Sequence, residues 1–192
     1  VGYRAGYDIT TGAKNISIGS FAGQDVTTGG YNIAVGYSAG GANGSNLTGY
    51  ENITIGGFSG TNITSANFNV AMGDSSLRNT TTGSNNTALG QQALRFNTTA
   101  SNNTAVGYQA GYSNTTGAYN TAIGDRPLRT NTTGNYNSAV GHSSLYYNTT
   151  GSSNVAFGYE SLRANTTASY NTAVGYQSLY DNTTGTQITA LG

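Results

Sequence analysis

The sequence predicts an all-β fold, a parallel β-solenoid (β-roll) of about eleven coils of 17 residues each. Three observations favour it: a glycine recurs at a fixed interval, apolar and small side chains alternate before it, and turn-forming residues follow it. The interval is 17 residues throughout, except for one of 20 between Gly36 and Gly56. A short fixed period is typical of one elongated array, so residues 1–192 are expected to form a single domain.

The anchor glycine is expected to bend each coil, since glycine adopts backbone angles that other residues avoid. The glycines chosen as structural anchors are Gly36, Gly73, Gly90, Gly107, Gly124, Gly141, Gly158 and Gly175. The three extra residues of the long interval, near 41–45, predict a bulged loop. A second segment follows each anchor, as in 176–180, and we expect it to form a second short strand before an Asn-Thr-Thr-Gly turn.

The strand before each anchor is predicted from period-two alternation with β-branched residues, as in 171–175. The residue directly before the glycine is always large and apolar, and we expect it to form the core: Val35, Leu89, Val106, Ile123, Val140, Phe157 and Val174. The residue before that is nearly always alanine. Small side chains allow close approach, so we expect these alanines to contact partner chains, the alternative being an exposed face of small residues: Ala88, Ala105, Ala122, Ala139, Ala156 and Ala173.

Asparagine stands four residues before the glycine in ten copies. Equivalent residues of neighbouring coils should stack about 4.8 Å apart, so that eleven coils form a rod of roughly 50 Å. Stacked asparagines form amide ladders. The predicted ladder contains Asn86, Asn103, Asn120, Asn137, Asn154 and Asn171.

Composition argues against several functions. Charged residues make up 7%, the formal net charge is zero and cysteine is absent, so we expect no nucleic-acid partner, disulfide or thiol metal site. No apolar run approaches the roughly 20 residues of a membrane span, so no membrane insertion is expected.

His142 replaces a recurrent tyrosine, and Asp74 and Asp125 share a column three coils apart. Without paired acids or a regular acidic ladder, we expect no enzyme, metal or cofactor.

The fifth residue after the anchor alternates between arginine and tyrosine over six coils. Cation–π contacts in such a column contribute about 0.5–1 kcal/mol each at exposed sites. The column is either a stabilising ladder or a stripe that binds glycans or another surface: Arg95, Tyr112, Arg129, Tyr146, Arg163 and Tyr180.

Asn-Thr-Thr recurs seven times from Asn79 to Asn182, either as a turn or as a formal N-glycosylation acceptor.

The repeated unit also resembles known families. The whole unit, as in 103–117, resembles repeats of tail-fibre-domain proteins of bacteria and viruses, and its pentapeptide Asn-Thr-Ala-Val-Gly is similar to the head repeats of trimeric autotransporter adhesins. The resemblance covers essentially the whole chain, although the 17-residue period is longer than that of the adhesin heads. It implies a β-roll in which three chains associate, on a cell surface, on a virion or in the extracellular space.

These observations lead to three functional hypotheses. The first is a structural or adhesive fibre segment, a homotrimer that also stacks end to end and binds cell-surface glycans by avidity. The second is an ice-binding solenoid, which is disfavoured because adjacent threonines such as Thr183 and Thr184 should point to opposite faces. The third is a polysaccharide-binding or polysaccharide-degrading tailspike, which lacks the acid pair that hydrolysis requires.

Overall fold

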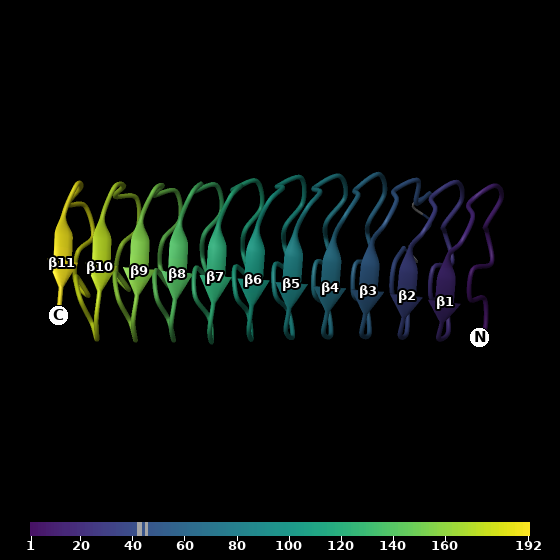
Figure 1. The fold of residues 1–192 in the computed structure, drawn as a ribbon, viewed down its shortest axis with the longest axis horizontal. Helices are drawn as coiled ribbons and strands as arrows, with labels where there is room; N and C mark the ends of the chain where they lie inside the picture. Colours follow the sequence, from purple (N-terminus) through teal and green to yellow (C-terminus); the bar gives the residue numbers. More distant parts are fainter. Residues whose placement is uncertain (42–43, 45) are drawn as a thin grey trace.

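The computed structural model describes residues 1–41, 44 and 46–192, and in this part the chain is an all-β parallel solenoid without helices (Figure 1). The two termini lie at opposite ends of the rod. Eleven three-residue strands form one sheet in sequence order. The strands are β1 (Ile16–Ile18), β2 (Ile33–Val35), β3 (Ile53–Ile55), β4 (Val70–Met72), β5 (Thr87–Leu89), β6 (Thr104–Val106), β7 (Thr121–Ile123), β8 (Ser138–Val140), β9 (Val155–Phe157), β10 (Thr172–Val174) and β11 (Thr189–Leu191).

The parallel solenoid predicted from the repeat is therefore confirmed. Each strand pairs in parallel with the strand of the next coil, and the pairing register joins equivalent residues, such as Ala105 with Ala122. Because the coil length equals the sequence period, every column of the repeat becomes a physical stack along the rod. The loop expected near 41–45 falls partly on residues 42, 43 and 45, which lie outside the described residues.

The expected second strand does not form, because residues 176–180 are a turn. Gln177 and Leu179 have φ angles of 52° and 53°, in the left-handed region, so the chain between them cannot run straight. Residues with positive φ alternate here with residues without it, and this alternation directs backbone groups toward neighbouring coils. Gln177 N–H donates to Tyr159 O at 2.8 Å, and Ser178 O accepts from Leu162 N–H at 3.0 Å. This turn thus maintains the hydrogen bonding between coils that a strand would have provided.

The anchor glycines are required on two grounds. Gly124 has a φ of 134°, which side-chain-bearing residues rarely adopt. A Cβ placed there would lie 2.6 Å from Gly141 O in the next coil, closer than atoms can pack. The anchor is therefore a position where the backbones of successive coils leave no room for a side chain.

The two faces of the strand are the reverse of those expected. The alanine column lies inside: Ala88, Ala105, Ala139, Ala156 and Ala173 are 0% exposed and Ala122 is 2% exposed, so they cannot contact partner chains. The column expected to form the core lies outside, with Val35, Leu89, Val106 and Val140 half-buried and Ile123, Val174 and Phe157 exposed by 38%, 37% and 43%.

Coil thickness explains this reversal. Leucines of the turn opposite the sheet, such as Leu128 and Leu162, are 0–1% exposed and pack against the alanines in one continuous cluster. A thin coil that holds a leucine on one wall has room only for a methyl group on the other.

Where glycine replaces the leucine, other residues fill the interior. Val26, Leu47 and Ile63 form a buried cluster in the N-terminal coils, which are the coils with glycine at the leucine position. Gly111 has no such substitute, and a cavity of about 10 Å³ remains beside it, lined in part by Leu94 and Leu128.

Candidate functional site

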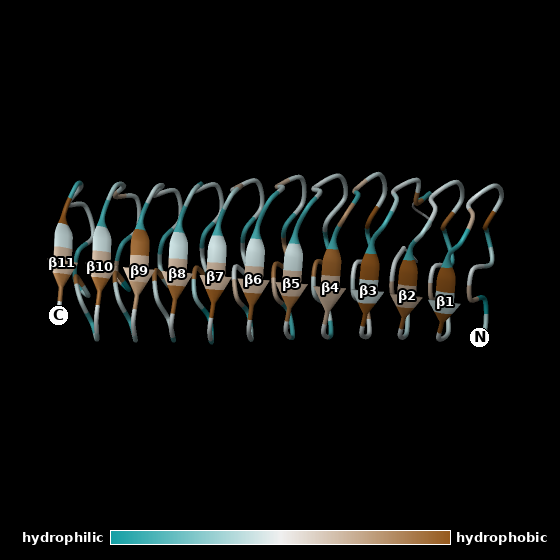
Figure 2. Cartoon of the chain, viewed as in Figure 1, coloured by the Kyte–Doolittle hydropathy of each residue, from teal (hydrophilic) through white to brown (hydrophobic). Residues whose placement is uncertain are grey.

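The outer sheet face is the first candidate site. We define it as the first and third residues of all eleven strands, which point away from the alanine core. In β1–β4 both columns are aliphatic, whereas in most later strands the first column is threonine or serine (Figure 2). Ile16, Ile18 and Met72 are 48%, 47% and 43% exposed. A continuous apolar strip of this length on a soluble surface indicates an interaction site.

The predicted asparagine ladder lies inside the coil and is structural. Asn137, which is 0% exposed, shows the pattern. Its Oδ1 accepts from the backbone N–H of Asn154 at 3.0 Å and from Asn154 Nδ2 at 3.2 Å, and its own Nδ2 donates to Gly151 O at 2.8 Å. The same bond from a backbone N–H to the Oδ1 of the preceding coil joins the other members of the ladder: Asn86, Asn103, Asn120, Asn154 and Asn171.

A second amide ladder was missed in the sequence, although its 17-residue recurrence was visible. The asparagines of the Asn-Thr-Thr motif from Asn97 to Asn165 are buried, and Asn148 Nδ2 donates to Asn131 Oδ1 at 2.8 Å and to Gly151 O at 2.9 Å. A glycan on Nδ2 would replace one of the two amide hydrogens, break one of these two bonds and place a sugar in the buried ladder. In the folded chain these buried motifs are therefore turn and ladder elements, and they are not accessible N-glycosylation sites.

The arginine–tyrosine stripe forms a half-buried stack along the rod. The guanidinium of Arg129 lies 5.3 Å from the Tyr112 ring centroid and 5.6 Å from that of Tyr146. Arg163 continues the stack, with its guanidinium 5.6 Å from the centroid of Tyr146 and its Nη1 donating to the Tyr180 hydroxyl at 2.9 Å. Arg95 Nη1 likewise donates to the Tyr112 hydroxyl at 3.2 Å. Guanidinium groups cover faces of these rings, so a glycan would meet mainly their edges.

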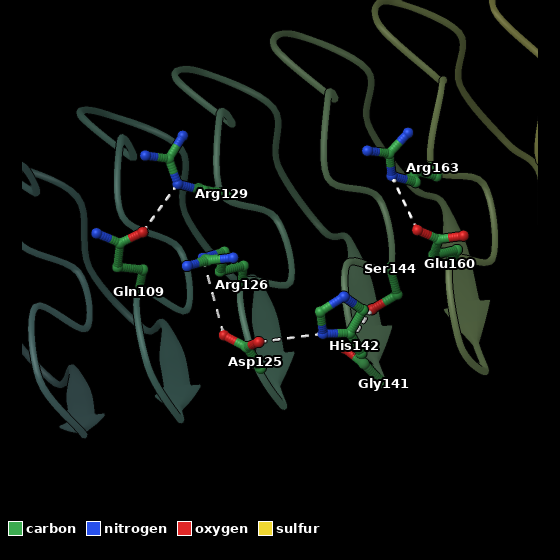
Figure 3. Close-up of polar contacts among 9 residues, drawn as sticks. All are labelled: Gln109, Asp125, Arg126, Arg129, Gly141, His142, Ser144, Glu160 and Arg163. Carbon is green, nitrogen blue, oxygen red and sulfur yellow. Dashed lines mark hydrogen bonds and ion pairs between the residues drawn. The ribbon is translucent and has the colours of Figure 1, made fainter.

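Polar partners hold the arginines of this stripe in place. Arg129 Nε donates to Gln109 Oε1 at 2.9 Å, and Arg163 Nε lies 3.3 Å from Glu160 Oε1 (Figure 3). Partial burial would lower the pKa of Arg163, but the nearby Tyr180, Tyr147 and Glu160 outweigh it and raise that pKa above its ordinary value. The raised pKa keeps the guanidinium charged, and these contacts favour the interpretation of the stripe as a stabilising ladder.

His142 extends a column of tyrosines and pairs with an acid. Its Nδ1 lies 3.1 Å from Asp125 Oδ2 (Figure 3). Its ring also stacks on Tyr159 at a centroid distance of 5.0 Å. Ser144 lies nearby, but it is 0% exposed and its hydroxyl donates to Gly141 O at 3.3 Å, so it is not available as a nucleophile. Among the residues that the structure describes, no group of three or more His, Cys, Asp or Glu side chains is placed to hold a metal ion.

An exposed aromatic column is the second feature that sequence reasoning missed. It lies five residues before the anchor glycine and includes Tyr119, Tyr136 and Tyr170, which are 53%, 61% and 64% exposed. The rings of Tyr119 and Tyr136 stack at 5.1 Å with an interplanar angle of 8°. The signal was the recurrence of tyrosine at 17-residue spacing.

The structure therefore separates the predicted residues into interior and exterior columns. The glycine, asparagine and alanine columns build the rod, and the aliphatic column and the aromatic columns face outward.

Within residues 1–41, 44 and 46–192, no helix is long and apolar enough to cross a membrane. Comparisons of the chain with protein-family models, curated proteins and solved structures found no match.

Proposed function

We propose that this chain is a rod segment of a structural or adhesive fibre, which associates with further copies of itself through the outer sheet face. The observation that carries the proposal is the apolar strip itself. Neighbouring coils are joined by hydrogen-bonded ladders, whereas the aliphatic side chains on the outer face of the described strands stay half-buried or exposed. The resemblance of the repeat to tail-fibre and adhesin-head repeats supports the same function, on a cell or virion surface.

The size of the face is adequate for stable association. Eleven strands give a length of roughly 50 Å, and two outward columns with their side chains are about 10 Å wide, so each chain offers about 500 Å². Two such faces bury about 1,000 Å² in total, which reaches the lower limit for a specific interface. The resemblance of the repeat to the head repeats of trimeric adhesins supports a homotrimer as the assembly.

Sedimentation of matched variants tests this proposal. The triple variant Val106→Lys, Ile123→Lys, Val140→Lys places charges on the outer sheet face, and we expect it to sediment as a folded monomer. The control Thr99→Lys, Thr116→Lys, Thr133→Lys adds the same charge to an exposed threonine column and should remain oligomeric. A monomeric wild-type chain at micromolar concentration, or an oligomeric outer-face variant, would contradict self-association through this face.

Ice binding is the second candidate, because the outer sheet face pairs threonine with aliphatic residues in the same strand. Thr87 and Leu89 of β5, and Thr172 and Val174 of β10, point outward together and repeat at about 4.8 Å. This array differs from the adjacent threonine pairs considered in the sequence. Ice binding requires the same face to be free, so a monomer with thermal hysteresis would favour it, and an oligomer without hysteresis would exclude it.

A further inference from the structure

The exposed aromatic column has a gap at Ser153. Four successive coils place Tyr119, Tyr136, Ser153 and Tyr170 at the same position, so one ring of the column is missing between two tyrosines. Tyr136 and Tyr170 are 61% and 64% exposed, and the stack of Tyr119 on Tyr136 ends at this gap.

The backbone is the same on both sides of the gap. Tyr136, Ser153 and Tyr170 have φ angles of 57°, 57° and 63°. Their N–H groups donate to equivalent carbonyls of the preceding coil, at 3.1, 2.9 and 3.1 Å. The two tyrosine side chains therefore leave the backbone in the same direction, two coils or about 9.6 Å apart.

We propose that the gap above Ser153 binds one neutral pyranose ring, clamped between the rings of Tyr136 and Tyr170. Two van der Waals contacts of about 3.5–4.0 Å take up roughly 7.5 Å of this separation and leave about 2 Å for the thickness of the ligand. A single ring fits this space, as the tyrosines of adjacent coils show, and the Ser153 hydroxyl favours a ring that carries hydroxyl groups over an aromatic one. The apolar face of a sugar packs on tyrosine rings, as other apolar groups do.

The surroundings of the gap suit hydroxyl groups without charge. Ser153 offers a hydroxyl at the base of the gap, and Thr150, three residues earlier in the same coil, is exposed. No Asp, Glu, Lys or Arg occurs within six residues of Tyr136, Ser153 or Tyr170 in the sequence. The site therefore fits a neutral hexose or N-acetylhexosamine and gives no cation to pair with an acidic sugar.

This gap differs from the arginine–tyrosine stripe, where guanidinium groups cover ring faces. The slot at this gap would supply a sugar contact for the adhesive part of the proposed function. Its binding does not depend on self-association. A single slot of this kind binds weakly, and several copies of the chain in one fibre would raise the attachment strength by avidity.

Saturation-transfer NMR with methyl glucoside, methyl galactoside and N-acetylglucosamine tests the proposal. The variant Ser153→Tyr fills the gap with the residue that adjacent rungs carry at the same φ, and it should reduce saturation transfer at least tenfold. The control Tyr119→Ser removes a ring outside the gap and should bind as the wild type does.

Circular dichroism and sedimentation of each variant, in the same buffer, show whether fold and oligomeric state are unchanged. Saturation transfer to one of the three sugars that is lost only in Ser153→Tyr supports the slot. Absence of transfer from wild type to all three sugars, or equal transfer with Ser153→Tyr, overturns it. Because sedimentation is measured separately, a failed slot is distinguishable from failed self-association.

Discussion

Removal of one amide from the middle of the buried ladder should weaken the whole rod. Asn137→Ala deletes the acceptor of the Asn154 N–H, which lies 3.0 Å from Asn137 Oδ1. It also deletes the bond from Asn154 Nδ2 to the same Oδ1 at 3.2 Å, and the bonds from Asn137 Nδ2 to Gly151 O at 2.8 Å and to Asn120 Oδ1 at 3.2 Å. The Gly151 carbonyl keeps Asn148 as a donor at 2.9 Å, so one buried backbone group is left without a partner.

The magnitude follows from these contacts. A buried N–H without a partner costs about 1–3 kcal/mol, and each of the three further hydrogen bonds contributes about 1 kcal/mol net. We therefore expect Asn137→Ala to lower the free energy of unfolding by about 4–6 kcal/mol. The effect should be local in origin, because each coil of a solenoid contacts only its neighbours.

Urea unfolding followed by circular dichroism measures the loss, and hydrogen exchange shows where it occurs. Protection should fall first around residues 137 and 154. Thr133→Ala, in the exposed threonine column of the same coil, is the control and should change stability by about 0.5 kcal/mol or less. A loss below about 1 kcal/mol for Asn137→Ala would refute the reasoning, because the buried ladder would then contribute no more than surface contacts.

Three further substitutions examine the core, the anchor and the stripe. Leu128→Ala removes a side chain that is 1% exposed and should lower the unfolding free energy by about 2–5 kcal/mol in urea titrations. Gly124→Ala forces a Cβ to 2.6 Å from Gly141 O and should cost about 3 kcal/mol or more, visible as rapid proteolysis near this junction. Arg163→Met removes the bond to Tyr180 and the ring contacts, and should lower the free energy of unfolding by about 1–2 kcal/mol. A lower melting temperature would report this loss.

The period of the sequence was sufficient to predict the solenoid and its columns, because stacking like residues at a fixed interval leaves few alternatives. It was not sufficient to assign the inner and outer faces. In Ala105 and Val106 both alternating columns are apolar, and alternation shows only that they lie on opposite faces. The choice depends on the size of the interior, which Leu128 on the far wall limits.

The second strand was predicted wrongly for a related reason. Residues such as Leu179 rarely adopt positive φ, so nothing in their identity indicates a left-handed backbone. Packing in the core and hydrogen bonds, such as the one from Asn182 N–H to Leu179 O within the turn, hold these leucines there. The gap at Ser153 could have been found from the sequence by comparing the tyrosines of each coil, but its meaning depends on knowing that this column is exposed.

The hydrogen bonds between coils run along the axis of the rod, and this direction determines how the rod responds to tension. A load applied to the two ends acts on every coil-to-coil junction in series, so the rod yields first at its weakest junction. The cavity beside Gly111 marks one junction with reduced packing. Each coil that opens releases 17 residues, or about 58 Å of extended chain, while the covalent chain stays intact. A fibre of such coils would lengthen stepwise under load, and each step would dissipate energy before the chain could break.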